Sequence, residues 1–232
     1  MMLPKTDKVY RTIILDFDGV LVESNEIKDK AFEMVFADYP GQITQILEYH
    51  RKTSLIRFEK FRYIVEKILK LPYSQQLEEE LARKFSGYCI KEVVVCPWVR
   101  GAEEFLSYYA GRLPLYLVSI NPLEDLQTIL GLRKMEHYFK GVYTAQESKT
   151  SQLQDILKKQ GLLPTEAVFI GDALSDYTSA KEAGINFIGR RSSKGSILSS
   201  SQSPFEGLSV PVFDDFYEIL RYIKGNTICQ NI

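Results

Sequence analysis

The chain has 232 residues, of which 45% are hydrophobic and 25% charged, as in a globular protein with one sizeable core. Lysine and arginine total 29, aspartate and glutamate total 30, and the net charge of -1 excludes broad electrostatic attraction to nucleic acid or an anionic membrane. The longest apolar runs have about five residues, against roughly 20 for a membrane span, and the first residues lack a signal-peptide pattern. Cys89, Cys96 and Cys229 lack CxxC spacing and are expected to be free thiols. We therefore expect a cytoplasmic monomer or homodimer with no nucleic-acid and no membrane partner.

Short apolar runs typical of strands recur along the chain, and amphipathic helical patterns separate them. The first run, at residues 12–15, has no polar alternation, which indicates a strand buried on both faces of a parallel sheet. Later runs of this kind lie at residues 113–118, 142–143, 167–170, 185–188 and 210–213. Strands that alternate with helices predict an α/β fold with a doubly wound, Rossmann-like parallel sheet.

Residues 24–96 interrupt this alternation. Apolar positions recur there at helical spacing, and turn-forming residues at 39–41 and 71–72 separate the helical stretches. We expect an α-helical cap at 24–96, inserted into an α/β core that comprises 1–23 and 97–232. Such a cap can close over a site at the strand ends and exclude water; an insertion with no gating role is the alternative.

The segment 192–203 contains seven serines, with Lys194 and Gly195 among them. We expect a mobile surface loop, because residues of this kind favour turns and loops. It does not match a phosphate-binding loop, because no GxxxxGK[ST] pattern precedes a helix there, and it is assigned no chemistry.

Two acidic residues follow the first predicted strand, in the order Asp16-Phe17-Asp18-Gly19. In an open parallel sheet, ligands bind outside the carboxyl ends of the strands. If strand geometry persists through Phe17, both carboxylates point to the same side of the sheet. Two carboxylates about 4 Å apart repel each other by about 4 kcal/mol at an effective dielectric of about 20. The pair therefore predicts a bound cation or one protonated carboxyl group, which suits a metal-bound nucleophile or a proton donor.

Three more polar residues lie at predicted strand ends or just beyond them. Ser119 ends the second strand and Asn121 opens the next helix, where a hydroxyl group and helix-start amides can hold a phosphate oxygen. Lys149 precedes an apolar helical pattern, and its ammonium group could neutralise a phosphate and the nucleophile. Taken singly, Ser119 could be a helix cap and Lys149 an exposed residue, although a cation at a helix N-terminus is unfavourable without an anion.

A second acidic pair lies in the stretch GDALSD, residues 171–176, directly after a predicted strand. Asp172 emerges at the strand end, and Asp176 follows one helical turn later. Magnesium prefers one or two carboxylates together with water and substrate phosphate, so Asp172 suits a direct ligand. Asp176 could be a ligand or could orient Lys149, and helix capping is the alternative for the whole stretch.

The ordered set DxD, Ser, Lys and GDxxxD resembles the haloacid dehalogenase-like phosphohydrolase superfamily over essentially the whole chain. The matching segments are 16–20 (DFDGV), Ser119, Lys149, 171–176 (GDALSD) and, where the chain enters the core after a helical cap, 97–102 (PWVRGA). The insertion is similar to the cap of the subgroup that contains phosphoglycolate phosphatase and β-phosphoglucomutase. Two departures are that Thr150 stands where the family often has proline, and that Gly171 stands where mutases often have glutamate, which argues against a mutase.

This resemblance implies a magnesium-dependent phosphatase. Asp16 would attack phosphorus to form an aspartyl-phosphate, and Asp18 would protonate the leaving alcohol and then deprotonate the hydrolytic water. Lys149 and Ser119 would stabilise the charge on the transferred group. Magnesium would bind Asp16, Asp172 and the backbone carbonyl of Asp18. The residues so assigned are Asp16, Asp18, Asp172 and Asp176 for the metal, and Ser119, Asn121 and Lys149 for the phosphate.

The expected substrate is a small phosphorylated metabolite, with a sugar phosphate as the preferred example. Arg51, Lys52 and Arg57 in the cap could recognise the leaving group or could be solvated charges. The alternatives are a β-phosphoglucomutase-like phosphomutase, a phosphonoacetaldehyde hydrolase, which would need a cap lysine such as Lys52, and a non-catalytic binding module. The second aspartate of the DxD motif argues against a haloacid dehalogenase. His50 and His137 are too isolated to indicate a metal pair or a catalytic base.

Overall fold

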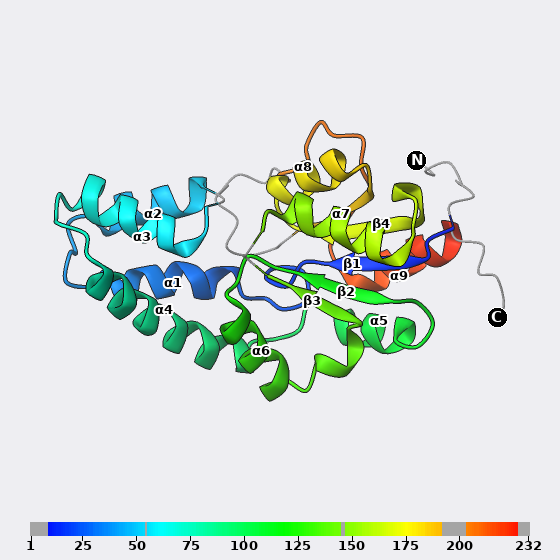
Figure 1. The fold of residues 1–232 in the computed structure, drawn as a ribbon, viewed down its shortest axis with the longest axis horizontal. Coiled ribbons are helices and arrows are strands. Elements are labelled where there is room, and N and C mark those ends of the chain that lie inside the picture. Colours follow the sequence, from blue (N-terminus) through cyan, green and yellow to red (C-terminus); the bar gives the residue numbers. More distant parts are fainter. Residues whose placement is uncertain (1–8, 54, 145–146, 192–202, 227–232) are drawn as a thin grey trace.

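The computed structural model describes residues 9–53, 55–144, 147–191 and 203–226, and its centre is one six-stranded sheet (Figure 1). The strands are β1 (Thr12–Leu15), β2 (Leu115–Val118), β3 (Gly141–Tyr143), β4 (Ala167–Gly171), β5 (Asn186–Arg190) and β6 (Val212–Phe213). All neighbouring strands are parallel, and their order is β3-β2-β1-β4-β5-β6. The predicted doubly wound parallel sheet is therefore confirmed. The predicted serine-rich loop, apart from Ser203, lies outside the described residues.

The central strand β1 is buried on both faces because its side chains alternate between two hydrophobic cores. Ile13 and Leu15 pack in a core that also contains residues of α5 (Ala102–Tyr109), α6 (Leu123–Leu132) and α9 (Phe216–Asn226). Ile14 packs on the opposite face, with α7 (Lys149–Gln160) and α8 (Leu174–Ala183). Helices on both faces explain why the strand carries no polar alternation.

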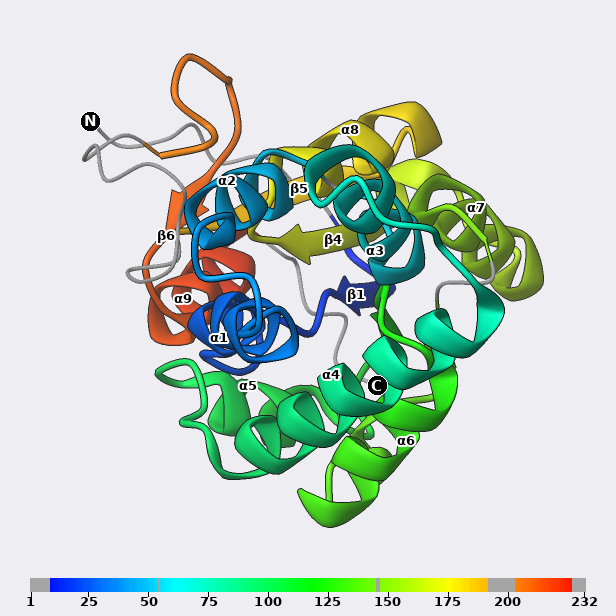
Figure 2. The same ribbon diagram turned by 90° about the vertical axis from the view of Figure 1, so that its left-hand side faces the viewer.

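Four helices between β1 and β2 form a helical cap with a core of its own. They are α1 (Asn25–Val35), α2 (Ile43–Lys52), α3 (Arg57–Tyr63), which continues into a π-helical turn (Ile64–Ile68), and α4 (Gln75–Val95). Their core contains Phe32, Phe36, Phe61 and Phe85, whose rings contact one another. Figure 2 views the molecule from the cap and shows these helices in front of β1 and β4. The predicted cap is therefore present, and its limits at residues 24 and 96 stay a prediction.

Two short 3-10 turns, Glu136–Tyr138 and Pro164–Glu166, complete the helical elements. Within the described ranges, no helix combines the length and the apolarity that crossing a membrane requires.

The strand order brings the carboxyl ends of β1, β2 and β4 together. Leu15, the last residue of β1, pairs with Leu117 of β2 and with Ile170 of β4. The helices that follow β2 and β4 cover opposite faces of the sheet, so β1 lies at the switch point where ligands bind in sheets of this type. The residues after each of these three strands therefore meet at one edge, which faces the cap.

Candidate active site

Three carboxylates gather at the ends of β1 and β4. Asp16 follows β1, Asp172 follows β4 and Asp176 lies in the first turn of α8, and one oxygen of each lies within 4.8 Å of the others. Burial outweighs the attraction of nearby cations and, with the neighbouring carboxylates, raises the pKa of Asp16 to about 7 and that of Asp172 to about 6. A hard divalent cation binds oxygen ligands and relieves the repulsion between neighbouring carboxylates. The cluster therefore fits a divalent metal.

Lys149 is the first residue of α7 and reaches the same cluster. Its Nζ lies 3.0 Å from Asp16 Oδ2 and 2.6 Å from Asp176 Oδ1, and its side chain is 10% exposed. Burial favours the neutral amine, but the two carboxylates outweigh burial and raise the pKa of Lys149, so the ammonium group is charged at neutral pH. The alternative of an exposed helix-start lysine is therefore wrong. The N-cap of α7 is Ser148, which accepts a hydrogen bond from Ser151 N.

Asp176 combines two of the roles considered from the sequence. Its Oδ1 accepts a hydrogen bond from Lys149 Nζ, and its Oδ2 accepts from the backbone amides of Asp172 and Ala173 at 3.2 and 3.1 Å. The fully buried side chain thus orients Lys149 and caps the start of α8. Gly171 permits this close approach, because a Cβ there would lie 2.4 Å from Asp176 Cβ. Direct binding of a metal by Asp176 stays a prediction, since both of its oxygens already have donors.

Asp18 lies outside the three-carboxylate cluster. The chain bends at Phe17, so strand geometry does not continue to Asp18 as expected from the sequence. Asp18 Oδ1 accepts a hydrogen bond from Ser24 Oγ at 2.6 Å. Its Oδ2 accepts from Lys28 Nζ at 2.6 Å and from Asn121 Nδ2 at 2.7 Å. Three donors thus hold the carboxylate away from the cluster, and binding of a metal by Asp18 stays a prediction.

The donors around Asp18 decide its charge. Burial alone would raise the pKa of Asp18, but the charge of Lys28 and the hydrogen bonds from Lys28, Ser24 and Asn121 outweigh burial and lower the pKa. Asp18 is therefore ionised at neutral pH and ready to accept a proton. Lys28 belongs to α1, and the sequence analysis missed it because helical spacing does not show which polar face of α1 meets the core.

Ser119 and Asn121 lie where β2 ends, at the same edge of the sheet. Ser119 is fully buried, its backbone N donates to Tyr143 O at 3.0 Å, and its Oγ accepts from the backbone N of Asn121 at 3.1 Å. The serine therefore shapes the turn after β2, and since no acceptor for its hydroxyl hydrogen lies among the described residues, that hydrogen can donate to a ligand. Asn121 joins this turn to Asp18.

Residues that the sequence analysis missed hold the loop after β1 in place. Asn25 Nδ2 donates to Asp172 Oδ2 at 2.8 Å. Arg190, at the end of β5, donates to Gly19 O at 2.8 Å and lies 2.5 Å from Glu23 Oε1. Gly19 has a φ of +68°, and a Cβ there would lie 2.1 Å from Asp172 Oδ2. The sequence did not indicate these contacts, because they join elements that are far apart in the chain.

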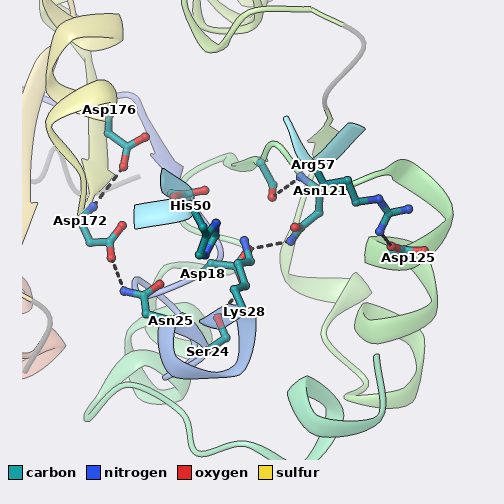
Figure 3. Close-up of polar contacts among 12 residues, drawn as sticks. Asp18, Ser24, Asn25, Lys28, His50, Arg57, Asn121, Asp125, Asp172 and Asp176 are labelled. Carbon is teal, nitrogen blue, oxygen red and sulfur yellow. Dashed lines mark hydrogen bonds and ion pairs between the residues drawn. The ribbon is translucent and has the colours of Figure 1, made fainter. Parts of the chain in front are cut away.

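A cavity of about 390 Å³ lies between Asp18 and the cap (Figure 3). The charged and polar side chains that line it include Asp18, Lys28, His50, Arg57, Lys60, Asn121, Glu124 and Asp125. Phe32, Phe58 and Phe85 contribute apolar walls. A volume of this size suits a small metabolite.

Comparison with known proteins identifies the family. The sequence profile of the haloacid dehalogenase-like hydrolases matches residues 13–190, which is most of the chain. The chain belongs to this family. The resemblance drawn from the four motifs is thus confirmed, and the protein is a hydrolase by family.

The curated relatives of this hydrolase are phosphatases. It is 26% identical over 186 residues to a phosphorylated carbohydrates phosphatase of Thermotoga maritima, an alignment that covers 76% of this chain and 82% of the relative. It is 22% identical over 178 residues to a phosphoglycolate phosphatase of Synechococcus elongatus, covering 75% and 81%. Among solved structures, a predicted phosphoglycolate phosphatase of Haemophilus somnus aligns with a TM-score of 0.73 at 19% identity, covering 92% and 97%. This structural likeness shows the shared fold.

In this hydrolase, the three cap residues proposed from the sequence have different surroundings. Arg57 lines the cavity, but its Nη1 lies 2.6 Å from Asp125 Oδ2, so its charge is already neutralised. Arg51 is held by Asp29 at 2.8 Å. Lys52 is 68% exposed and pairs with a glutamate one helical turn away at 3.5 Å. The position of Lys52 therefore does not favour the phosphonoacetaldehyde hydrolase alternative that required it.

Proposed function

We propose that this haloacid dehalogenase-like hydrolase is a magnesium-dependent phosphatase that cleaves a small phosphorylated metabolite through an aspartyl-phosphate intermediate. Its curated relatives are named for phosphorylated carbohydrates and for phosphoglycolate, which supports a sugar phosphate or a similar small phosphate monoester as substrate. Gly171 in place of a glutamate supports a phosphatase rather than a mutase.

The observation that carries the proposal is the position of Asp16. Its carboxylate lies at the end of the central strand, within the carboxylate cluster and 3.0 Å from Lys149 Nζ. Magnesium held by Asp16, Asp172 and the backbone carbonyl of Asp18 would neutralise these carboxylates and the phosphoryl oxygens. Lys149 stabilises the ionised form of Asp16, which is the form that acts as a nucleophile.

The proposed reaction has two displacements at phosphorus. In the first, Asp16 attacks phosphorus, the bond to the alcohol oxygen breaks, and that oxygen takes a proton from Asp18. In the second, water attacks the aspartyl-phosphate, its proton passes to Asp18, and phosphate leaves as the Asp16 carboxylate is restored. Lys149 and Ser119 donate hydrogen bonds to the transferred group and stabilise its charge.

The surroundings of Asp18 suit the second displacement better than the first. The ionised carboxylate has three donors and can accept the proton of water. To donate a proton in the first displacement, Asp18 must carry one, and the nearby charge of Lys28 opposes this. Substrate must therefore draw Lys28 away from Asp18 or compensate its charge.

Phosphate release from p-nitrophenyl phosphate and from a panel of phosphorylated metabolites tests the proposal. We expect turnover that requires magnesium and that falls by at least about 1000-fold in Asp16→Asn, because removal of a covalent nucleophile also abolishes the steps that depend on it. Asp38→Asn is the matched control, since Asp38 is an exposed aspartate of the cap. Parental turnover in a folded Asp16→Asn variant would contradict the proposal, and retention of phosphate on an isomerised substrate would indicate a mutase.

A further inference from the structure

The cavity under the cap contains a buried cation that forms no ion pair with any carboxylate of the described residues. Lys60 belongs to α3, is 6% exposed and lines the cavity. Its Nζ contacts two atoms of His50, the ring Nδ1 at 3.1 Å and the backbone O at 3.0 Å. Among the residues that the structure describes, no carboxylate oxygen lies within 4.0 Å of Lys60 Nζ, whereas Lys28 and Arg57 each have such a partner. Lys60 is therefore the cavity cation that is open to an external anion.

The contact with His50 holds Lys60 without neutralising it. A lysine ammonium group can only donate, so Nδ1 of His50 accepts and the ring proton sits on Nε2, 3.5 Å from Asp29 Oδ1. Burial and the charges of Lys60, Lys28 and Arg51 lower the pKa of His50 to about 2, so the ring is neutral. The Asp29 carboxylate is shared with Arg51. This network positions the amine, and the charge of Asp29 acts on Lys60 only from beyond ion-pair distance, where burial and the charge of Lys28 outweigh it.

The ammonium group has one hydrogen left for a ligand. Two of its three hydrogens point to His50, and the side chain faces a cavity with aromatic walls, where a charge interacts more strongly than in water. Burial, with the charge of Lys28, lowers the pKa of Lys60 to about 8, so the amine is mainly protonated at pH 7. A buried ammonium group without a direct ion-pair partner is unfavourable, and an anionic ligand group would reduce that penalty.

We propose that the cap side of this cavity is an anion subsite, in which Lys60 binds a second anionic group on the alcohol part of the substrate. The inference rests on the proposed phosphatase function and narrows its substrate class. The same cavity reaches Asp18, which acts on the leaving oxygen in the proposed reaction, and His50, Lys28 and Arg57 also line it (Figure 3). A substrate whose leaving oxygen lies at Asp18 extends from there into the cap. Its second anionic group is a carboxylate or a phosphate.

Matched substrate pairs show whether the second anionic group is a carboxylate or a phosphate. For the carboxylate, 2-phosphoglycolate is compared with 2-hydroxyethyl phosphate; for the phosphate, fructose 1,6-bisphosphate is compared with fructose 1-phosphate. p-Nitrophenyl phosphate has no second anionic group and reports on the phosphatase chemistry alone. We expect the wild-type protein to prefer the anionic member in one pair, and that pair identifies the group.

Lys60→Met tests the residue. It is expected to lower kcat/KM for the preferred anionic substrate by roughly 10- to 100-fold, mainly by raising KM, because loss of a hydrogen bond to a charged group weakens binding by about that factor. Turnover of p-nitrophenyl phosphate is expected to stay within about twofold, because the reacting groups are untouched. Lys52→Met removes the same charge from an exposed position of the cap and should change neither. If Lys60→Met does not fold, Lys60→Gln serves in its place.

Two results would overturn the subsite while leaving the phosphatase in place. One is wild-type turnover of p-nitrophenyl phosphate with no preference in either pair. The other is an equal loss for all substrates in the Lys60 variant. Absence of any p-nitrophenyl phosphate turnover by the wild-type protein would instead contradict the proposed function, and the subsite with it.

Discussion

The substitution Gly19→Ala should disable the candidate metal site through one misplaced carboxylate. Gly19 has a φ of +68°, so alanine there adds about 1–2 kcal/mol of backbone strain. The new Cβ would lie 2.1 Å from Asp172 Oδ2 and 2.4 Å from Asn25 Nδ2, so Asp172 must move by about 1 Å to reach ordinary contact. A displacement of that size at a catalytic group lowers the rate by about 100-fold. We expect such a loss in kcat/KM and a higher magnesium concentration for half-maximal activity.

Gly161→Ala is the matched control, because Gly161 has a φ of +61° and nothing lies within 4 Å of its added Cβ. Urea unfolding should show the backbone-strain loss of about 1–2 kcal/mol in Gly161→Ala and a larger loss in Gly19→Ala, where overpacking adds to the strain. A magnesium titration of p-nitrophenyl phosphate turnover should show the catalytic defect in Gly19→Ala alone. Parental activity and magnesium dependence in Gly19→Ala would refute the reasoning. An equal catalytic loss in Gly161→Ala would assign the effect to backbone strain.

Two further predictions concern the charges of the cluster. Lys149→Met leaves Asp16 and Asp176 without their cation. The free energy of unfolding of the metal-free protein, measured in urea at neutral pH, should therefore fall by about 3–5 kcal/mol, and turnover should fall at least about 100-fold. A smaller change in both quantities would contradict the role of this lysine. Because the pKa of Asp16 is raised to about 7 and that of Asp172 to about 6, the metal-free protein should lose stability as pH rises from about 4 to about 7, and magnesium binding near pH 6.5 should release about one proton. Calorimetric titration in buffers of different ionisation enthalpy measures that release, and its absence would count against the cluster as the metal site.

The fold was predictable because its main features are local in the sequence. A strand buried on both faces requires an uninterrupted apolar run, and residues 12–15 provide one at the centre of the sheet. The cap helices repeat apolar residues at helical spacing, as at Phe32 and Phe36, which pack in the cap core. Asp16 and Asp172 could be placed together because the carboxyl ends of neighbouring parallel strands share one edge.

The contacts of the cap could not be predicted, because they depend on how two units pack against each other. Helical spacing marks the apolar face of α1 but does not show that Lys28, on a polar position, reaches Asp18. For the same reason the sequence did not indicate Lys60. Arg57 was a candidate although Asp125 of α6 neutralises its charge, because helical spacing does not show that contact either. The separate surroundings of Asp18 follow from a bend at Phe17, whose direction the motif alone does not specify.

The proposed mechanism depends most on a covalent bond between phosphorus and the side chain of Asp16. Rapid acid quench of the magnesium-loaded enzyme during turnover, followed by peptide mass spectrometry, measures this bond directly. We predict a phosphorylated, hydroxylamine-sensitive peptide that contains Asp16, and none in the Asp16→Asn variant. Steady turnover by the wild-type enzyme with no phosphorylated intermediate, or with the phosphoryl group on another residue, would contradict the proposed mechanism.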